Sequence, residues 1–145
     1  MSRLLPLAVL LAGTSVLLPA AAQTPMASTP SPRGAKVYII SPADGATVSS
    51  PVHVVFGVSG MDVAPAGTQK QNTGHHHLLI DTDIPKDTSL PLPSNEHIHH
   101  FGKGQTETSI ELSPGKHTLQ LEFADYAHRP FDPMVASKKI TITVR

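Results

Sequence analysis

The chain has 145 residues, of which nine are histidine and none is cysteine, and its formal net charge at pH 7 is +0. Without cysteine, disulfides, thiolate metal ligands and iron–sulfur clusters are excluded. A near-neutral chain also lacks the electrostatic basis for binding nucleic acid. The length favours a single domain.

Residues 1–22 predict a cleavable signal peptide. Arg3 precedes an apolar run over residues 4–18, and small residues end the segment at Ala22. The run contains proline and glycine and is shorter than the ~20 uninterrupted apolar residues of a spanning helix. We therefore expect a periplasmic or secreted protein with no membrane span in its mature form.

The remaining chain predicts a linker followed by one folded domain. Residues 23–35 are rich in proline, serine and threonine without apolar periodicity, which predicts a flexible linker. Residues 36–145 show short β-type runs between turn residues and no helical period. This pattern predicts an all-β domain, an immunoglobulin-like two-sheet antiparallel sandwich of about seven strands.

The clearest strand is predicted over residues 116–123, where apolar and polar residues alternate. The turn sequence Ser113-Pro114-Gly115 predicts that this strand forms a hairpin with residues 106–112. Prolines, among them Pro130 and Pro133, are expected between strands. Further strands are expected over residues 37–40, 52–58, 77–80 and 140–144.

Six of the histidines form two short clusters. Both clusters are associated with long connections between the predicted strands, which span residues 60–74 and 82–104. The clusters are His75-His76-His77 and His97, His99 and His100. Long irregular connections are uncommon in a compact domain unless they serve a function. The two histidine clusters are therefore the candidate functional residues.

The spacing within each cluster is typical of metal ligands. In an extended strand, residues i and i+2 point to the same side, so His75 with His77, and His97 with His99, can each present two imidazoles to one ion. His76 and His100 are then expected on the opposite faces. If the clusters meet at one end of the sandwich, Asp125 and His128 are the natural additional ligands.

Nitrogen and carboxylate donors suit Cu(II), Zn(II) or Ni(II) better than Cu(I), and we expect copper or zinc. The alternative is that the histidines brace loops through hydrogen bonds. For His117, in phase with buried residues of its strand, and for isolated His53, this structural interpretation is preferred.

The motifs do not support an enzyme. His97-Ile98-His99 followed by a Pro-Gly-Lys-His run has the order of a cupin, but Glu107 lies too far after His99 for the cupin ligand set. No phosphate-binding loop or nucleophile elbow is present. A metal-dependent hydrolase or oxygenase would need an open coordination position and a substrate pocket, which the sequence does not indicate.

Several segments resemble known families. The sequences SPADGATVSSPVHVVFGVSG and LSPGKHTLQLEFAD, with the final ITITV, are similar to bacterial immunoglobulin-like modules. The runs GHHHLLIDTD, HIHHFGKGQTET and SPGKHTLQLEFADYAHRPFDP resemble the secreted bacterial family known as domain of unknown function 4399, over residues 37–144. The resemblance implies export and a histidine-rich β domain, and it implies no established activity.

From these observations we expect an exported, non-enzymatic protein that binds copper or zinc through its histidines and serves in metal buffering, delivery or tolerance. The alternative function is a non-catalytic interaction module of the cell envelope with an envelope protein as partner, in which the histidines are structural.

Overall fold

The computed structural model describes residues 27–145, so the predicted signal peptide lies outside the described residues. This part of the chain forms ten strands and no helix, which confirms the predicted all-β class. Among residues 27–145, accordingly, no helix is able to cross a membrane. The strands are β1 Lys36–Ser41, β2 Thr47–Val48, β3 Val52–Ser59, β4 Asp62–Val63, β5 Thr73–Ile80, β6 Ile98–His100, β7 Glu107–Ile110, β8 Gly115–Ala124, β9 Pro130–Ala136 and β10 Ile140–Val144.

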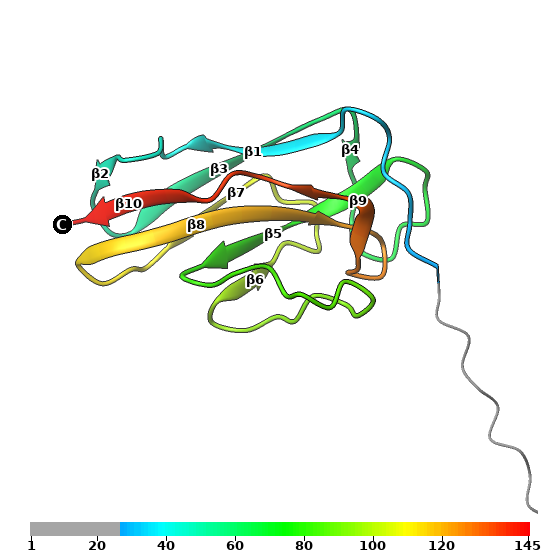
Figure 1. The fold of residues 1–145 in the computed structure, drawn as a ribbon. Coiled ribbons are helices and arrows are strands. Elements are labelled where there is room, and N and C mark those ends of the chain that lie inside the picture. Colours follow the sequence, from blue (N-terminus) through cyan, green and yellow to red (C-terminus); the bar gives the residue numbers. More distant parts are fainter. Residues whose placement is uncertain (1–26) are drawn as a thin grey trace, which may run out of the picture.

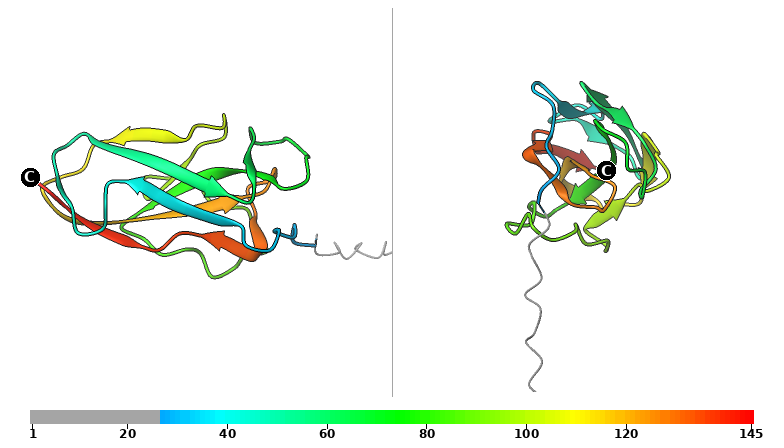
Figure 2. Two further views of the ribbon diagram at one scale, coloured as in Figure 1. Left: turned by 90° about the horizontal axis from the view of Figure 1, so that it is seen from above. Right: turned by 90° about the vertical axis from the view of Figure 1, so that its right-hand side faces the viewer.

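The strands form two sheets that pack as a sandwich, as predicted (Figure 1). The smaller sheet has the order β1-β3-β7, and the larger has the order β2-β10-β8-β5-β4, with β6 added to β5 and β9 added to β8. Most pairs are antiparallel, but β2 pairs with β10 and β4 with β5 in parallel. Figure 2 shows the two layers from above and from one end.

The hydrophobic core lies between the sheets and follows the period of two that the sequence predicts. In β3 the side chains of Val52, Val54 and Phe56 are buried while His53 between them is exposed. On the facing sheet, β8 contributes Leu119, Leu121 and Phe123, β10 contributes Ile142 and Val144, and β5 contributes Leu78 and Ile80. Burial of these side chains is the main force holding the two sheets together.

Strand β5 is buried on both faces, since all eight of its residues are classed as buried. Leu78 and Ile80 belong to the core, so their neighbours His77 and Leu79 point to the outer side of the large sheet. This outer side is covered as well, because Leu79 and its register partner Ile98 on β6 are both buried. The outer face of β5 is therefore a second enclosed layer.

One predicted strand pairing is wrong. Strands β7 and β8 do not form a hairpin: β7 pairs with β3 in the small sheet, whereas β8 pairs with β5 and β10 in the large one. The segment Ser113-Pro114-Gly115 thus begins a crossing between the two layers. A turn sequence fixes a change of chain direction, but it does not determine whether the next strand stays in the same sheet.

Strand β9 was also not expected, because Pro130 and Pro133 were placed between strands. Proline is compatible with this strand because, among the ten strands, β9 pairs with β8 alone and forms an edge of the sheet. Within the segment expected to be a linker, the backbone amide of Ser31 donates a hydrogen bond to the carbonyl of Asp132 in β9 at 3.2 Å. Residues near Ser31 are therefore attached to the domain.

We predict that Gly74→Ala destabilises the fold by about 1–3 kcal/mol through overpacking. A Cβ at position 74 would lie 2.4 Å from the carbonyl oxygen of Ala124 and 2.8 Å from the Phe123 ring, and neither can move without disturbing the β5–β8 pair. Urea unfolding measures the change in free energy.

The matched control is Gly57→Ala, where the three atoms nearest to the Cβ all belong to the ring of Tyr38, which is 45% exposed and able to turn away. We expect Gly57→Ala to cost clearly less than Gly74→Ala. Equal costs for the two variants would contradict the close β5–β8 approach.

Candidate metal centre

Four imidazoles converge on the outer side of the large sheet, at the start of β5. His75 and His77 come from β5, His100 from β6, and His128 from the loop between β8 and β9. His100 is the register partner of His77, so these two rings lie on the same face. The ring centres of the four residues are 4.5 to 6.1 Å apart.

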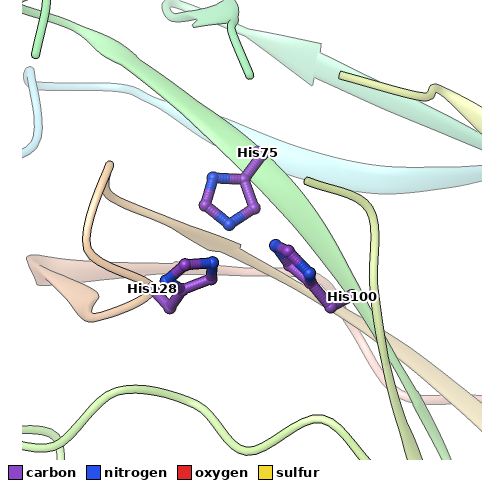
Figure 3. A group of neighbouring side chains, drawn as sticks. All are labelled: His75, His100 and His128. Carbon is purple, nitrogen blue, oxygen red and sulfur yellow. The ribbon is translucent and has the colours of Figure 1, made fainter. Parts of the chain in front are cut away.

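Three of these residues present nitrogen atoms to one another. One ring nitrogen each from His75, His100 and His128 lies within 4.8 Å of the other two. Figure 3 shows the three rings arranged around a common space, with nitrogen atoms turned toward it. His77 is next to this group, with its ring centre 4.9 Å from that of His75 and 5.1 Å from that of His100.

The turn between β8 and β9 positions His128. The Asp125 carboxylate accepts hydrogen bonds from the backbone amides of Ala127 at 2.8 Å and Arg129 at 2.9 Å, and the Asp125 carbonyl accepts one from the His128 amide. His128 has a φ of 64°, a left-handed conformation that glycine or asparagine normally occupies in such turns. A histidine at this position keeps its ring beside His75 at the expense of local backbone strain.

The connection between β5 and β6 closes over this end of the sheet. The backbone amide of Leu92 donates a hydrogen bond to the carbonyl of His128 at 2.7 Å, and Leu92 is buried. As a result His75 and His77 are fully buried, while His100 and His128 remain partly exposed. The solvent-accessible part of the four-histidine group is therefore formed by His100 and His128.

The buried imidazoles have few partners within the described residues. Neither ring nitrogen of His75 or His77 has a hydrogen-bond partner there, and the same holds for Nε2 of His100. Buried polar atoms in folded proteins are nearly always hydrogen-bonded, and each exception calls for a physical explanation. A neutral imidazole has one nitrogen with a free lone pair, which is the form that binds a metal ion.

The environment favours this neutral form. Burial, followed by the charges of His100 and His128, lowers the pKa of His75 to about 4, while Asp125 acts weakly in the opposite direction. Burial and the neighbouring imidazoles lower the pKa of His77 to about 2. Burial and His128 also lower the pKa of His100. At neutral pH these rings are uncharged and have the protonation state of a ligand.

Glu122 is a buried acidic residue on the same face. It is the register partner of His77 across β5 and β8, has an exposed fraction of 0%, and neither carboxylate oxygen has a hydrogen-bond partner among the described residues. Burial raises its pKa to about 7. Glu122 is not among the residues predicted from sequence, although its place in the alternating strand 116–123 already puts it opposite the apolar face.

Of the six residues proposed from sequence as ligands, the structure brings three into this group, His75, His77 and His128. Asp125 lies beside the group, but its carboxylate is already held: Oδ2 accepts a hydrogen bond from the Thr29 hydroxyl at 2.7 Å. It also forms an ion pair with Arg129 at 3.6 Å. The geometry gives Asp125 the role of shaping the turn.

The other two proposed ligands, His97 and His99, lie away from the group. Nδ1 of His97 lies 3.1 Å from the Ile80 carbonyl, and Nε2 of His99 lies 3.2 Å from the Glu96 carbonyl. In their place His100 faces His77, because the β5–β6 register makes Leu78, on the core side of β5, the partner of His99. His100, expected on the opposite face, is thus the residue that β6 contributes.

Gly102 makes room for His100. A Cβ at position 102 would lie 2.2 Å from Cε1 and 2.5 Å from Nε2 of the His100 ring. The Asn95 side chain fixes the start of β6 by accepting hydrogen bonds from the amides of His97 and Ile98 at 2.8 and 2.9 Å. Which residues of the HIHH segment point to the outer face therefore depends on the turn at Asn95 before it and on Gly102 after it.

The remaining histidines have other surroundings. His76 points into the core between the rings of Phe56 and Phe123, with centre distances of 5.1 and 4.9 Å. His117 is hydrogen-bonded to Asp81 at 2.6 Å and to the Ser113 carbonyl at 2.8 Å, as a structural histidine should be, and the Asp81 hydrogen bond raises its pKa.

The fold and this site define a β-sandwich domain with a buried histidine cluster at one end of its larger sheet. The chain belongs to the family described as Domain of unknown function (DUF4399), whose model matches residues 54–145 and thus includes every residue of the cluster. This confirms the family resemblance found in the sequence. Comparison with curated proteins and with solved structures gave no significant match.

We predict that the metal-free protein loses stability as the pH falls below about 6.5. In the unfolded chain the buried histidines bind protons near pH 6.5, whereas folding lowers the pKa of His75 and His76 to about 4 and that of His77 to about 2. Glu122 has the opposite effect, because folding raises its pKa, so the folded protein binds about one proton that the unfolded chain releases. Unfolding then takes up about two protons net near pH 5, and the free energy of unfolding falls by about 3 kcal/mol per pH unit.

Urea unfolding of chelator-treated protein at several pH values measures this slope. His76→Leu, which replaces a core histidine and leaves the four-histidine group intact, should reduce the slope by about 1 kcal/mol per pH unit. A free energy of unfolding that is flat between pH 7 and pH 5 would show that the histidines are not buried in their neutral form.

Proposed function

We propose that the protein binds one divalent transition-metal ion, Cu(II) or Zn(II), through His75, His100 and His128, with His77 as the fourth imidazole. The observation that carries the proposal is the convergence of four imidazoles from three separate segments, with their ring centres 4.5 to 6.1 Å apart. Four imidazoles bound tetrahedrally to one ion at about 2 Å have ring centres about 5 Å apart.

The chemistry of the donors supports this class of ion. Imidazole nitrogen suits copper, zinc and nickel, and the part of the chain that the structure describes offers no thiolate to favour a softer ion. The low pKa values of His75 and His77 keep both rings ready to bind without first losing a proton. The partial exposure of His100 and His128 leaves the ion a route of entry and exit.

The biological role that fits such a site is metal buffering, delivery or tolerance outside the cytoplasm. The N-terminal sequence supports export, since it has the charge, apolar run and small residues of a signal peptide. A site reached through two partly exposed ligands suits an ion that is exchanged. The proposed role requires no catalysis.

Calorimetric titration of the protein lacking residues 1–22 with Cu(II) and with Zn(II) tests the proposal. We expect saturable binding of one ion per chain. The affinity should fall as the pH drops toward about 4, the lowered pKa of His75, where protons compete with the ion for this imidazole. The absence of saturable binding below about millimolar concentrations would show that the histidines serve only the structure.

We predict that His128→Gly lowers the affinity for the ion by more than about tenfold. Loss of a residue that only supports a ligand already lowers metal affinity by about tenfold or more, and loss of a ligand itself should cost more. Glycine suits the left-handed backbone at position 128, and the two backbone hydrogen bonds of this residue remain possible. The turn should therefore persist while the imidazole is lost.

The control for this variant is His53→Ala, which removes an exposed imidazole from the other sheet. We expect His53→Ala to bind the ion as the parent protein does. If His128→Gly also binds with unchanged affinity, His128 is not a ligand.

A further inference from the structure

Glu122 completes a row of side chains that crosses three strands on the outer face of the large sheet. His77 of β5 is the register partner of His100 on β6 and also of Glu122 on β8. Directly paired residues on one face have Cβ atoms about 4.5–5.5 Å apart. The carboxylate of Glu122 is therefore one strand away from His77, on the side opposite His100.

The carboxylate has no other use among the described residues. Its exposed fraction is 0%, neither oxygen has a hydrogen-bond partner, and its β9 register partner is Ala136, which offers no polar side chain. Asp125, the other acidic residue next to the cluster, is held by Thr29, by backbone amides and by Arg129. Glu122 is the buried acidic residue that these contacts leave without a role.

A divalent ion bound by four neutral imidazoles carries its full charge into a buried site. Burial of uncompensated charge is costly, and a carboxylate next to a metal-bound histidine commonly offsets this cost and orients the ring. Glu122 is placed to do both through His77, because one nitrogen of the His77 ring can face the ion while the other donates a hydrogen bond to the carboxylate.

We propose that Glu122 is the counter-charge of the site, a positioning residue that acts through His77 and makes the site selective for divalent over monovalent ions. This inference rests on the proposed function. Electrostatic attraction to the carboxylate is proportional to the charge of the ion. Neutralising Glu122 therefore removes twice as much binding free energy for a divalent ion as for a monovalent one. The affinity for the divalent ion falls by the square of the factor for the monovalent ion.

The experiment compares the parent protein with Glu122→Gln in calorimetric titrations with Zn(II) and with Ag(I), a monovalent ion that imidazole also binds. We predict that Glu122→Gln lowers the affinity for Zn(II) by about 100-fold and that for Ag(I) by about tenfold. Glu122→Asp, which keeps the charge on a shorter side chain, should recover part of the Zn(II) affinity. Circular dichroism confirms that each variant is folded.

The matched control is Glu107→Gln, which removes one negative charge from an exposed position on β7 in the other sheet and should leave both affinities unchanged. Equal losses for Zn(II) and Ag(I), or no loss for either, would overturn the role of Glu122 while leaving the metal site intact. If the parent protein binds neither ion, the proposed function fails as well, and the two failures are thereby distinguished.

Discussion

The arrangement of this domain depends on one constraint: strand β5 is covered on both faces. The alternation of a β-strand sends Leu78 and Ile80 into the core and His75 and His77 to the other side of the sheet. In an ordinary sandwich that other side faces water, and histidines there are solvated. Here the β5–β6 connection, tied through Leu92 to His128, closes over it, so a polar face becomes an enclosed site.

The large sheet then fixes which residues meet in that enclosed layer. The β5–β6 register brings His100 beside His77, and the β5–β8 register brings Glu122 to its other side. A shift of either register by one residue would turn every side chain of the partner strand to the opposite face. The site is therefore determined by strand pairing, and the identity of its residues follows from that pairing.

Strand alternation was readable from the sequence, whereas pairing was not. The period of two predicted β3, β8 and β10 and the class of fold, and the spacing of His75 and His77 predicted correctly that they share a face. The structure places His100, and not His97 or His99, beside His77, because Asn95 and Gly102 set which face each residue of β6 points to, through a side-chain hydrogen bond and a close approach that spacing alone does not reveal. Glu122 was overlooked because an acid in an alternating strand normally points to solvent.

The buried polar residues of the cluster lower the stability of the fold. Each buried polar group left without a partner costs about 1–3 kcal/mol, and the net stability of a domain is only about 5–15 kcal/mol. The rings of His75 and His77 and the carboxylate of Glu122 together represent a large part of such a margin. His128 adds a left-handed backbone that glycine would adopt without strain. An apolar set of side chains would make a more stable sandwich end, and under the proposed function the bound ion offsets the burial of these residues.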